Sequence, residues 1–238
     1  MTPRTKEQNE EIRLRRLAQI RKAAADVFLN KGPLLEIRDV AAQAGLGYGT
    51  VYHYYSNKGD LLHDLLWDAL VRAGEWLEAP HASVFGEAPA GGELSWATDT
   101  GNTIAADSRS ESRQTAAAAE RGSVAAVGVR LLQLWADDHG LYLLHKLAGE
   151  GFVSLPEARS TPLSAAFQRE VLAPFAALLE TGRAADGAAD VGGNAAEPMY
   201  RIQRAEMLLA ALVGCASVSL RRGKLHEEAS DIIRFLKL

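Results

Sequence analysis

The chain has few of the features that mark a secreted or membrane protein. Its only cysteine is Cys215, which excludes a disulfide within the chain and is typical of a reducing cytoplasm. The first 16 residues are mostly charged or polar and do not resemble a signal peptide. The longest nearly apolar run, 208–220, has 13 residues, whereas a membrane-spanning helix needs about 20. We therefore expect a cytoplasmic protein that does not enter a membrane.

Aromatic residues are also sparse, at 7% of 238 residues, which disfavours a strand-rich sandwich or barrel. Alanine, the best intrinsic helix former, contributes 41 residues, and an apolar content of 47% is enough for a sizeable core. The composition predicts an all-α fold.

The charge is distributed unevenly. A net charge of −4, taken alone, disfavours a nucleic-acid binder. Residues 1–66, however, hold ten Lys/Arg and eight Asp/Glu, a net charge of +2, whereas the rest of the chain holds 16 and 22, a net charge of −6. This asymmetry indicates an N-terminal part with a different kind of partner from the rest.

Apolar side chains recur at spacings of three and four residues, which predicts helices along most of the chain. The predicted helices span 12–30, 37–44, 48–55, 57–79, 123–148, 163–182, 199–220 and 229–238. We expect an interruption at Gly140, a kink at Pro174 and a flexible loop over 183–198. Residues 80–95 are typical of a loop, and 96–122 stay unassigned. The predicted domains are a helix-turn-helix domain (1–56), a connecting helix (57–79) and a ligand-binding and dimerisation domain (80–238).

Segment 37–58 carries the strongest functional signal. Two short helical patterns flank a glycine turn there, which predicts a helix-turn-helix. Ala41 lies four residues before Gly45, where crossing helices approach closely, and Gly45 supplies the positive φ of the turn. The third helix of the motif exposes side chains that can bond to base edges and phosphates in a major groove, namely Tyr48, Thr50, Tyr52 and His53.

Residues 14–66 resemble the TetR family of bacterial transcription regulators. The matching segments, in order, are DVFLNKG, IRDVAAQAG, GTVYHYY and NKGDLL. The resemblance implies a homodimer that places two recognition helices into successive major grooves of a palindromic operator, about 34–36 Å apart. The positions that it assigns to base contact are Tyr48, Gly49, Thr50 and His53. By the same resemblance, Tyr52 lies against the DNA backbone and Lys58 reaches a phosphate.

The position of Lys58 supports a phosphate contact independently of the family resemblance. A lysine at the start of a helix opposes the helix dipole, so it fits an anion site that it forms with the free backbone N–H groups. The chain departs from the family elsewhere, because Gly47 and Tyr48 replace a frequent serine and lysine. The usual threonine cap before the second helix is absent, with Leu35 and Glu36 in that region. We therefore expect fewer phosphate contacts than is usual.

The C-terminal part is predicted to bind an effector and to dimerise. Candidates for the pocket lining are Trp96, Trp135, Phe152, Phe167, Phe175 and Met207, for each of which plain core packing is the alternative. The apolar segments 199–220 and 229–238 are expected to pair with their copies, as the resemblance implies and their apolar density supports. The predicted function is a repressor that a small molecule releases from its operator.

Other interpretations have less support. A helical ligand-binding or adaptor protein with a degenerate DNA-binding head stays an alternative because of Gly47 and the absent cap. Asp137, Asp138, His139 and His145 could suggest a metal site, but neighbouring residues on a helix point in different directions. No Ser/His/Asp arrangement, Walker loop or paired-cysteine site occurs in the sequence. We therefore expect no enzymatic activity, cofactor or metal.

Overall fold

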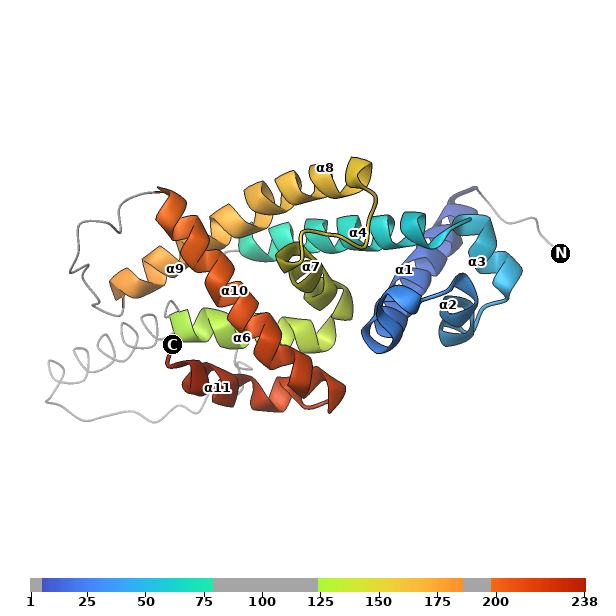
Figure 1. Ribbon diagram of the computed structural model, residues 1–238. Helices are drawn as coiled ribbons and strands as arrows, with labels where there is room; N and C mark the ends of the chain where they lie inside the picture. Colours follow the sequence, from blue (N-terminus) through green and yellow to red (C-terminus); the bar gives the residue numbers. More distant parts are fainter. Residues whose placement is uncertain (1–5, 79–123, 186–197) are drawn as a thin grey trace, which may run out of the picture.

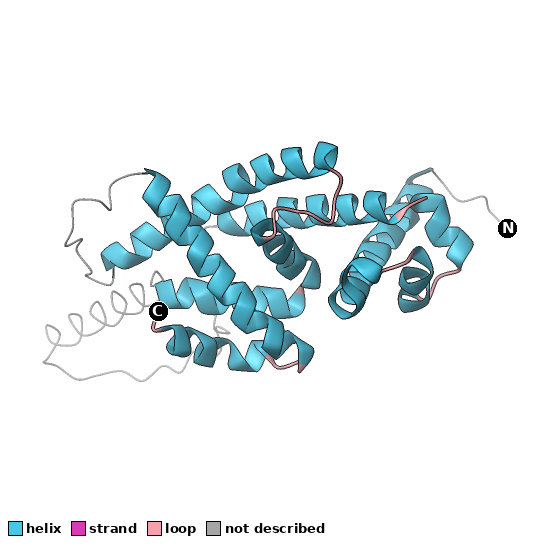
Figure 2. Cartoon of the chain, viewed as in Figure 1, coloured by secondary structure: helices cyan, strands magenta, loops and turns pink. Residues whose placement is uncertain are grey.

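The computed structural model describes residues 6–78, 124–185 and 198–238, which form helices and turns without strands (Figures 1 and 2). The elements are α1 (Lys6–Lys31), the 3-10 turn η1 (Gly32–Leu34), α2 (Ile37–Ala44), α3 (Tyr48–Tyr54), α4 (Lys58–Glu78), α6 (Val124–Asp137), α7 (His139–Gly149), α8 (Glu157–Phe167), the π turn η2 (Gln168–Leu172), α9 (Ala173–Ala185), α10 (Pro198–Arg221) and α11 (Leu225–Leu236). Figure 1 places α1–α3, here called the head, at one end of the molecule, and α4 runs from there into α6–α11, here called the body. The expected all-α fold is confirmed.

Small side chains allow the helices of the head to cross closely. α1 buries Ile20, Ala24 and Phe28, and Ala41 of α2 is also buried. Gly45 ends α2 with φ +64, and the N–H of Leu46 donates to the carbonyl of Ala41 at 2.9 Å. This bond closes a Schellman turn, whose left-handed residue favours glycine. The structure therefore has the glycine turn that the sequence predicted.

Several helix ends differ from the sequence prediction, and three of them have a local explanation. α1 begins at Lys6 instead of residue 12, because exposed ion pairs extend it beyond its apolar face, such as Glu10–Arg13 at 2.8 Å. α3 ends at Tyr54, one residue early, since the backbone of Tyr55 is extended. α11 begins at Leu225 instead of 229, and Leu225 is itself buried.

The break between α6 and α7 falls at Asp138, so the predicted interruption at Gly140 is wrong. Asp138 has an extended backbone, and its Oδ1 accepts from the N–H groups of Gly140 at 2.9 Å and Leu141 at 3.3 Å. Gly140 lies inside α7 and is buried. An aspartate that caps a new helix, and not the nearby glycine, therefore sets the boundary.

The predicted helix 163–182 is replaced by α8, η2 and α9, so it begins at Glu157 and is not continuous. The irregularity is the π turn Gln168–Leu172, which ends two residues before Pro174. A proline has no N–H for the regular helical bond, and a wider turn is one way in which a helix accommodates it. Trp96, the predicted loop 80–95 and the unassigned segment 96–122 lie outside the described residues, as does most of the predicted loop 183–198.

α10 is the one helix of the described part that is long and apolar enough to cross a membrane, by length and composition alone. It packs against α7, α9 and α11, so it belongs to the helical body (Figure 1). Only 28% of its apolar window is buried. Met207 and Val218 therefore present apolar surface away from the core, at 68% and 57% exposure.

Candidate nucleic-acid interface and effector cavity

The outer face of α3 presents two stacked tyrosines. The rings of Tyr48 and Tyr52 lie 5.7 Å apart at an interplanar angle of 28°, and the residues are 55% and 50% exposed. Thr50 is half-buried and His53 is exposed, while Val51 is fully buried and fixes α3 to the head. Gly49 is exposed and has free space where a side chain would lie. The structure thus brings the predicted α3 residues to one solvent-accessible helix.

Lys58 stands where the starts of α2, α3 and α4 meet. Its exposed Nζ donates to the carbonyl of Pro33 at 2.8 Å, and together with Arg38 and Tyr48 it borders a hollow of about 600 Å³. Asn57 caps α4, since its Oδ1 accepts from the N–H of Asp60 at 2.8 Å. The lysine therefore lies beside the hollow as a surface cation that can turn towards a phosphate.

The start of α2 is held without a threonine cap. The carboxylate of Asp39 accepts from the N–H of Glu36 at 3.2 Å, so the third helical residue satisfies the group before the helix. Lys31 pairs with Asp39 at 2.6 Å, and this hydrogen bond lowers the pKa of the Asp39 carboxyl. The departure from the family pattern therefore changes which residue caps the helix and leaves α2 intact.

Charged side chains connect the head to the body. The hydroxyl of Tyr55 donates to Asp64, and Arg21 pairs with Asp64 at 3.4 Å and with Asp68 at 3.0 Å. Burial, aided by the bond to Asp64, raises the pKa of Tyr55 above its ordinary value. Sequence reasoning missed this network, because its members lie 9 to 47 residues apart in the chain.

The network continues to the start of α7. Arg72 pairs with Asp68, and its Nε donates to Oδ2 of Asp138 at 2.9 Å. His139 contacts Asp26 of α1 with an Nδ1–Oδ1 distance of 2.6 Å. Asp138 and His139, two of the residues weighed as metal ligands, thus have separate partners. No group of three His, Cys, Asp or Glu in the described part of the chain could hold a metal ion.

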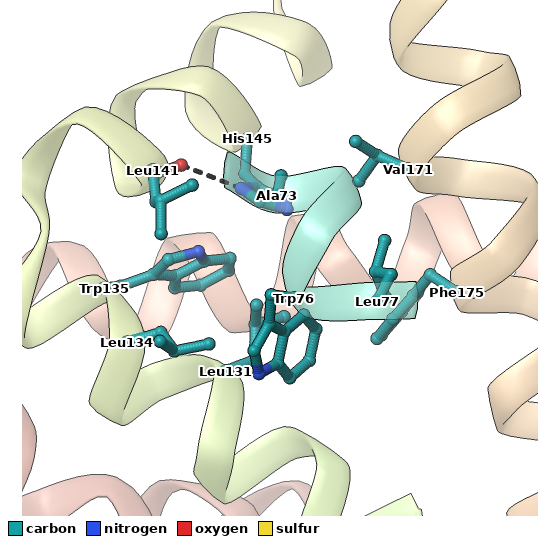
Figure 3. A pocket seen from close by; sticks show the side chains of 10 residues that line it. All are labelled: Ala73, Trp76, Leu77, Leu131, Leu134, Trp135, Leu141, His145, Val171 and Phe175. Atoms are coloured by element: carbon teal, nitrogen blue, oxygen red, sulfur yellow. Dashed lines mark hydrogen bonds between the residues drawn. The ribbon is translucent and has the colours of Figure 1, made fainter. Parts of the chain in front are cut away.

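A small apolar cavity lies between α4, α6, α7, η2 and α9 (Figure 3). Of the predicted pocket residues, Trp135 and Phe175 line it, together with Trp76 and Val171. Its volume is about 10 Å³, close to the minimum that holds one water. The indole N–H of Trp135 is buried and has no hydrogen-bond partner among the described residues. A buried donor without an acceptor is costly, so this group is suited to a ligand oxygen.

His145 forms part of the same wall. Its Nδ1 lies 2.8 Å from the carbonyl of Leu141, the bond drawn in Figure 3, so this nitrogen carries the proton. Burial lowers the pKa of His145 to about 4, and the neutral ring keeps Nε2 as an acceptor. The ring lies 5.0 Å from that of Trp135 and 5.7 Å from that of Phe167, centroid to centroid. Sequence reasoning considered His145 only as a metal ligand and missed this position.

Three further predicted pocket residues line a second, open groove between α7, α8 and α10. Phe152, Phe167 and Met207 border this groove, whose volume is about 740 Å³. His145 borders the cavity as well as the groove, so an aromatic wall of His145 and Phe167 separates the two spaces. Phe152 is buried and holds a left-handed backbone with φ +53, a conformation that is uncommon for a bulky residue.

Comparison with known proteins identifies the head. Residues 20–65 match the profile of the bacterial regulatory proteins of the tetR family. The head is thus similar to the helix-turn-helix domain of that family over these residues. No curated protein sequence matches the chain significantly.

Two solved structures of regulators share the overall fold. The transcriptional regulator FadR from Bacillus subtilis, in complex with stearoyl-CoA, is 20% identical with a TM-score of 0.53, and the match covers 92% of this chain and 96% of that one. The fatty acid degradation regulator FadR from Bacillus halodurans is 16% identical with a TM-score of 0.51 and the same coverage. At these identities the likeness shows the fold, a helix-turn-helix followed by a larger helical part.

Proposed function

We propose that this chain is a transcriptional repressor that binds a palindromic DNA operator as a homodimer and releases it when an effector binds the body. The observation that carries the proposal is the TetR-family head, whose α3 exposes Tyr48 and Tyr52 beside the cation Lys58. Tyr48, Gly49, Thr50 and His53 contact bases, Tyr52 lies against the DNA backbone, and Lys58 binds a phosphate. The head carries little net positive charge, so a dimer, which doubles it, is needed for useful affinity.

The dimer is proposed to form through α10 and α11, over residues 199–220 and 229–238. Outward-facing apolar side chains support this assignment, namely Met207, Val218 and Phe235, the last at 78% exposure. Exposed apolar area of this kind is typical of a protein–protein interface. A two-fold axis through these helices gives each operator half-site one head.

The effector is proposed to be a mainly apolar molecule with a hydrogen-bond acceptor. Apolar side chains line the cavity, and the unpaired N–H of Trp135 is available to a carbonyl oxygen. An acyl thioester has this chemistry, and stearoyl-CoA is the molecule bound to the Bacillus subtilis FadR of similar fold. We place its apolar chain in the open groove, from which it reaches Trp135 once the rings of His145 and Phe167 turn aside.

Effector binding is proposed to reach the DNA surface through the charged network. Leu141 and His145 of α7 border the cavity, while Asp138 at the start of α7 pairs with Arg72 of α4. A shift of α7 therefore moves α4, and with it the position of α3. A coupling of about 1–3 kcal/mol between effector and operator is typical of such regulators.

Selection from a random duplex DNA library with the full chain tests the proposal. We expect an enriched palindrome with half-sites about one helical turn apart, bound in a way that weakens steeply with salt. Binding without sequence preference, or no binding at physiological salt, would overturn the proposal and favour an adaptor protein with a degenerate head.

A further inference from the structure

The recognition helix has an unusual set of side chains for reading DNA. α3 (Tyr48–Tyr54) has the sequence YGTVYHY and contains no Arg, Lys, Asn, Gln, Asp or Glu. Arg and Lys read guanine through two hydrogen bonds, and Asn and Gln read adenine in the same way. α3 therefore cannot supply the paired hydrogen bonds that most often specify these two bases.

The large groups that α3 does expose are two tyrosine rings. Tyr48 and Tyr52 lie one turn apart and stack at 5.7 Å and 28°, so the two rings form one apolar plate. Each residue keeps about half of its surface in solvent, at 55% and 50%. Stacking limits the ring rotamers, so little conformational entropy is lost when a partner covers the plate.

The nearby cations are placed for phosphates. Lys58 is bonded to the carbonyl of Pro33, and Arg38 pairs with Glu36 at 2.6 Å. Both border the hollow at the starts of α2 and α4 and lie outside α3. Base discrimination is thus left to the ring of Tyr48, which Tyr52 supports by stacking, to the hydroxyl and methyl of Thr50 and to His53.

In the major groove, the 5-methyl of thymine is the apolar group on the base edges. We propose that the ring of Tyr48, held in place by stacking on Tyr52, reads thymine methyl groups, so that the operator half-site is specified by thymine at the positions this ring covers. The inference rests on the proposed DNA-binding function, since it assigns a base chemistry to the same α3 surface.

The experiment replaces thymine by uracil, one position at a time, in the palindrome that the full chain selects. Uracil lacks only the 5-methyl, so pairing and the hydrogen-bonding edges are unchanged. Loss of one buried methyl corresponds to about a fourfold weaker Kd at each covered position. 5-Methylcytosine paired with guanine at the same position keeps the methyl but changes the hydrogen-bonding edge, and we expect it to bind better than unmethylated cytosine.

Substitutions in α3 test whether the loss of affinity for uracil depends on the two tyrosine rings. In Y48A and Y52A the ratio of uracil to thymine Kd should fall towards one, whereas Y48F and Y52F keep the rings and the ratio. H53A is the matched control from the same helix, and it should weaken binding while the ratio stays near fourfold. Circular dichroism melting checks that all variants fold, which we expect because these side chains are exposed.

The possible results are separable. A selected site at which uracil changes no Kd, or at which Y48A and Y52A keep the full ratio, would overturn the thymine inference while DNA binding stands. Failure to select any site would remove the proposed function, and the inference with it.

Discussion

The two ends of the molecule use aromatic side chains in opposite ways. In the head, Tyr48 and Tyr52 stack on each other and stay about half exposed, at 55% and 50%. In the body, Trp135 and Phe175 are at most 1% exposed and line a cavity. The comparison teaches that exposure, and not residue type, separates a surface that can contact DNA from a wall that can hold an effector. The predictions below test this contrast.

Truncating an aromatic side chain should have its largest effect on stability in the body. Trp135→Ala removes a fully buried ring and leaves a cavity, so we expect the free energy of unfolding to fall by about 3–5 kcal/mol. Tyr48→Ala, at an exposed position, should change it by less than about 0.5 kcal/mol. Urea unfolding measures both. An equal loss in the two variants would remove the contrast between the two ends.

The buried histidine should make stability depend on pH. The pKa of His145 is about 4 in the folded chain against 6.5 ordinarily, so between these values the unfolded chain binds a proton that the folded chain excludes. The free energy of unfolding should therefore fall as pH is lowered from 6.5 to 4, by roughly 3 kcal/mol. Asp39 and Asp60 have lowered carboxyl pKa values, so their protonation changes the free energy of unfolding only below this pH range.

Chemical denaturation across this pH range checks the assignment. His145→Gln should remove most of the slope, and His226→Gln, at an exposed position, is the matched control that should keep it. A slope that persists without His145 would assign the pH dependence to other groups.

The contact between α4 and α7 should contribute less to the free energy of unfolding than the buried side chains of Trp135 and His145. Asp138→Ala removes the cap of α7 and the partner of Arg72, and we expect a loss of about 1–2 kcal/mol. Asp138→Asn keeps a capping oxygen but not the charge, so it should recover more than half of that stability. If Asn is as damaging as Ala in thermal unfolding, the ion pair and not the cap holds this junction.

A conservative change at Trp135 sharpens the comparison inside the body. Trp135→Phe removes the unpaired N–H but keeps a ring, so stability should fall far less than in Trp135→Ala. If the N–H bonds to the effector, affinity for an acyl-CoA should drop about fivefold. Isothermal titration measures this, and unchanged affinity would assign the effector to contacts away from the indole nitrogen.

The smallest expected effect concerns the phosphate contact. Lys58→Ala should weaken binding to all duplexes alike and reduce the slope of log Kd against log salt by about one unit. Anisotropy titrations at several salt concentrations give both quantities. A change in which sequence is preferred, with the slope unchanged, would show that Lys58 reads bases.

Sequence reasoning succeeds in the head because local rules decide its structure. Ala41 and Gly45 each have one function that their neighbours in the sequence reveal, and the structure has both at the crossing and turn that the sequence predicts. The resemblance to a known family covers the same residues. The start of α1 was predicted late because exposed ion pairs leave no apolar pattern.

The body is less predictable because its features arise from packing between distant segments. The cap at Asp138 and the π turn before Pro174 were missed, since glycine and proline are the stronger local signals. The predicted pocket residues are divided between a cavity and a groove, a distinction that periodicity does not contain. His145 lies in the wall between them because of contacts made across helices.

The central claim is that the body controls the DNA affinity of the head. The most direct test is the Kd of the full chain for its selected operator, measured by fluorescence anisotropy with and without saturating stearoyl-CoA. A coupling of about 1–3 kcal/mol predicts an operator Kd that rises about 5- to 150-fold when stearoyl-CoA is added. In Trp135→Phe, the same rise in operator Kd should require a higher concentration of stearoyl-CoA. An operator Kd that saturating stearoyl-CoA leaves unchanged, although the molecule binds the chain, would contradict the account.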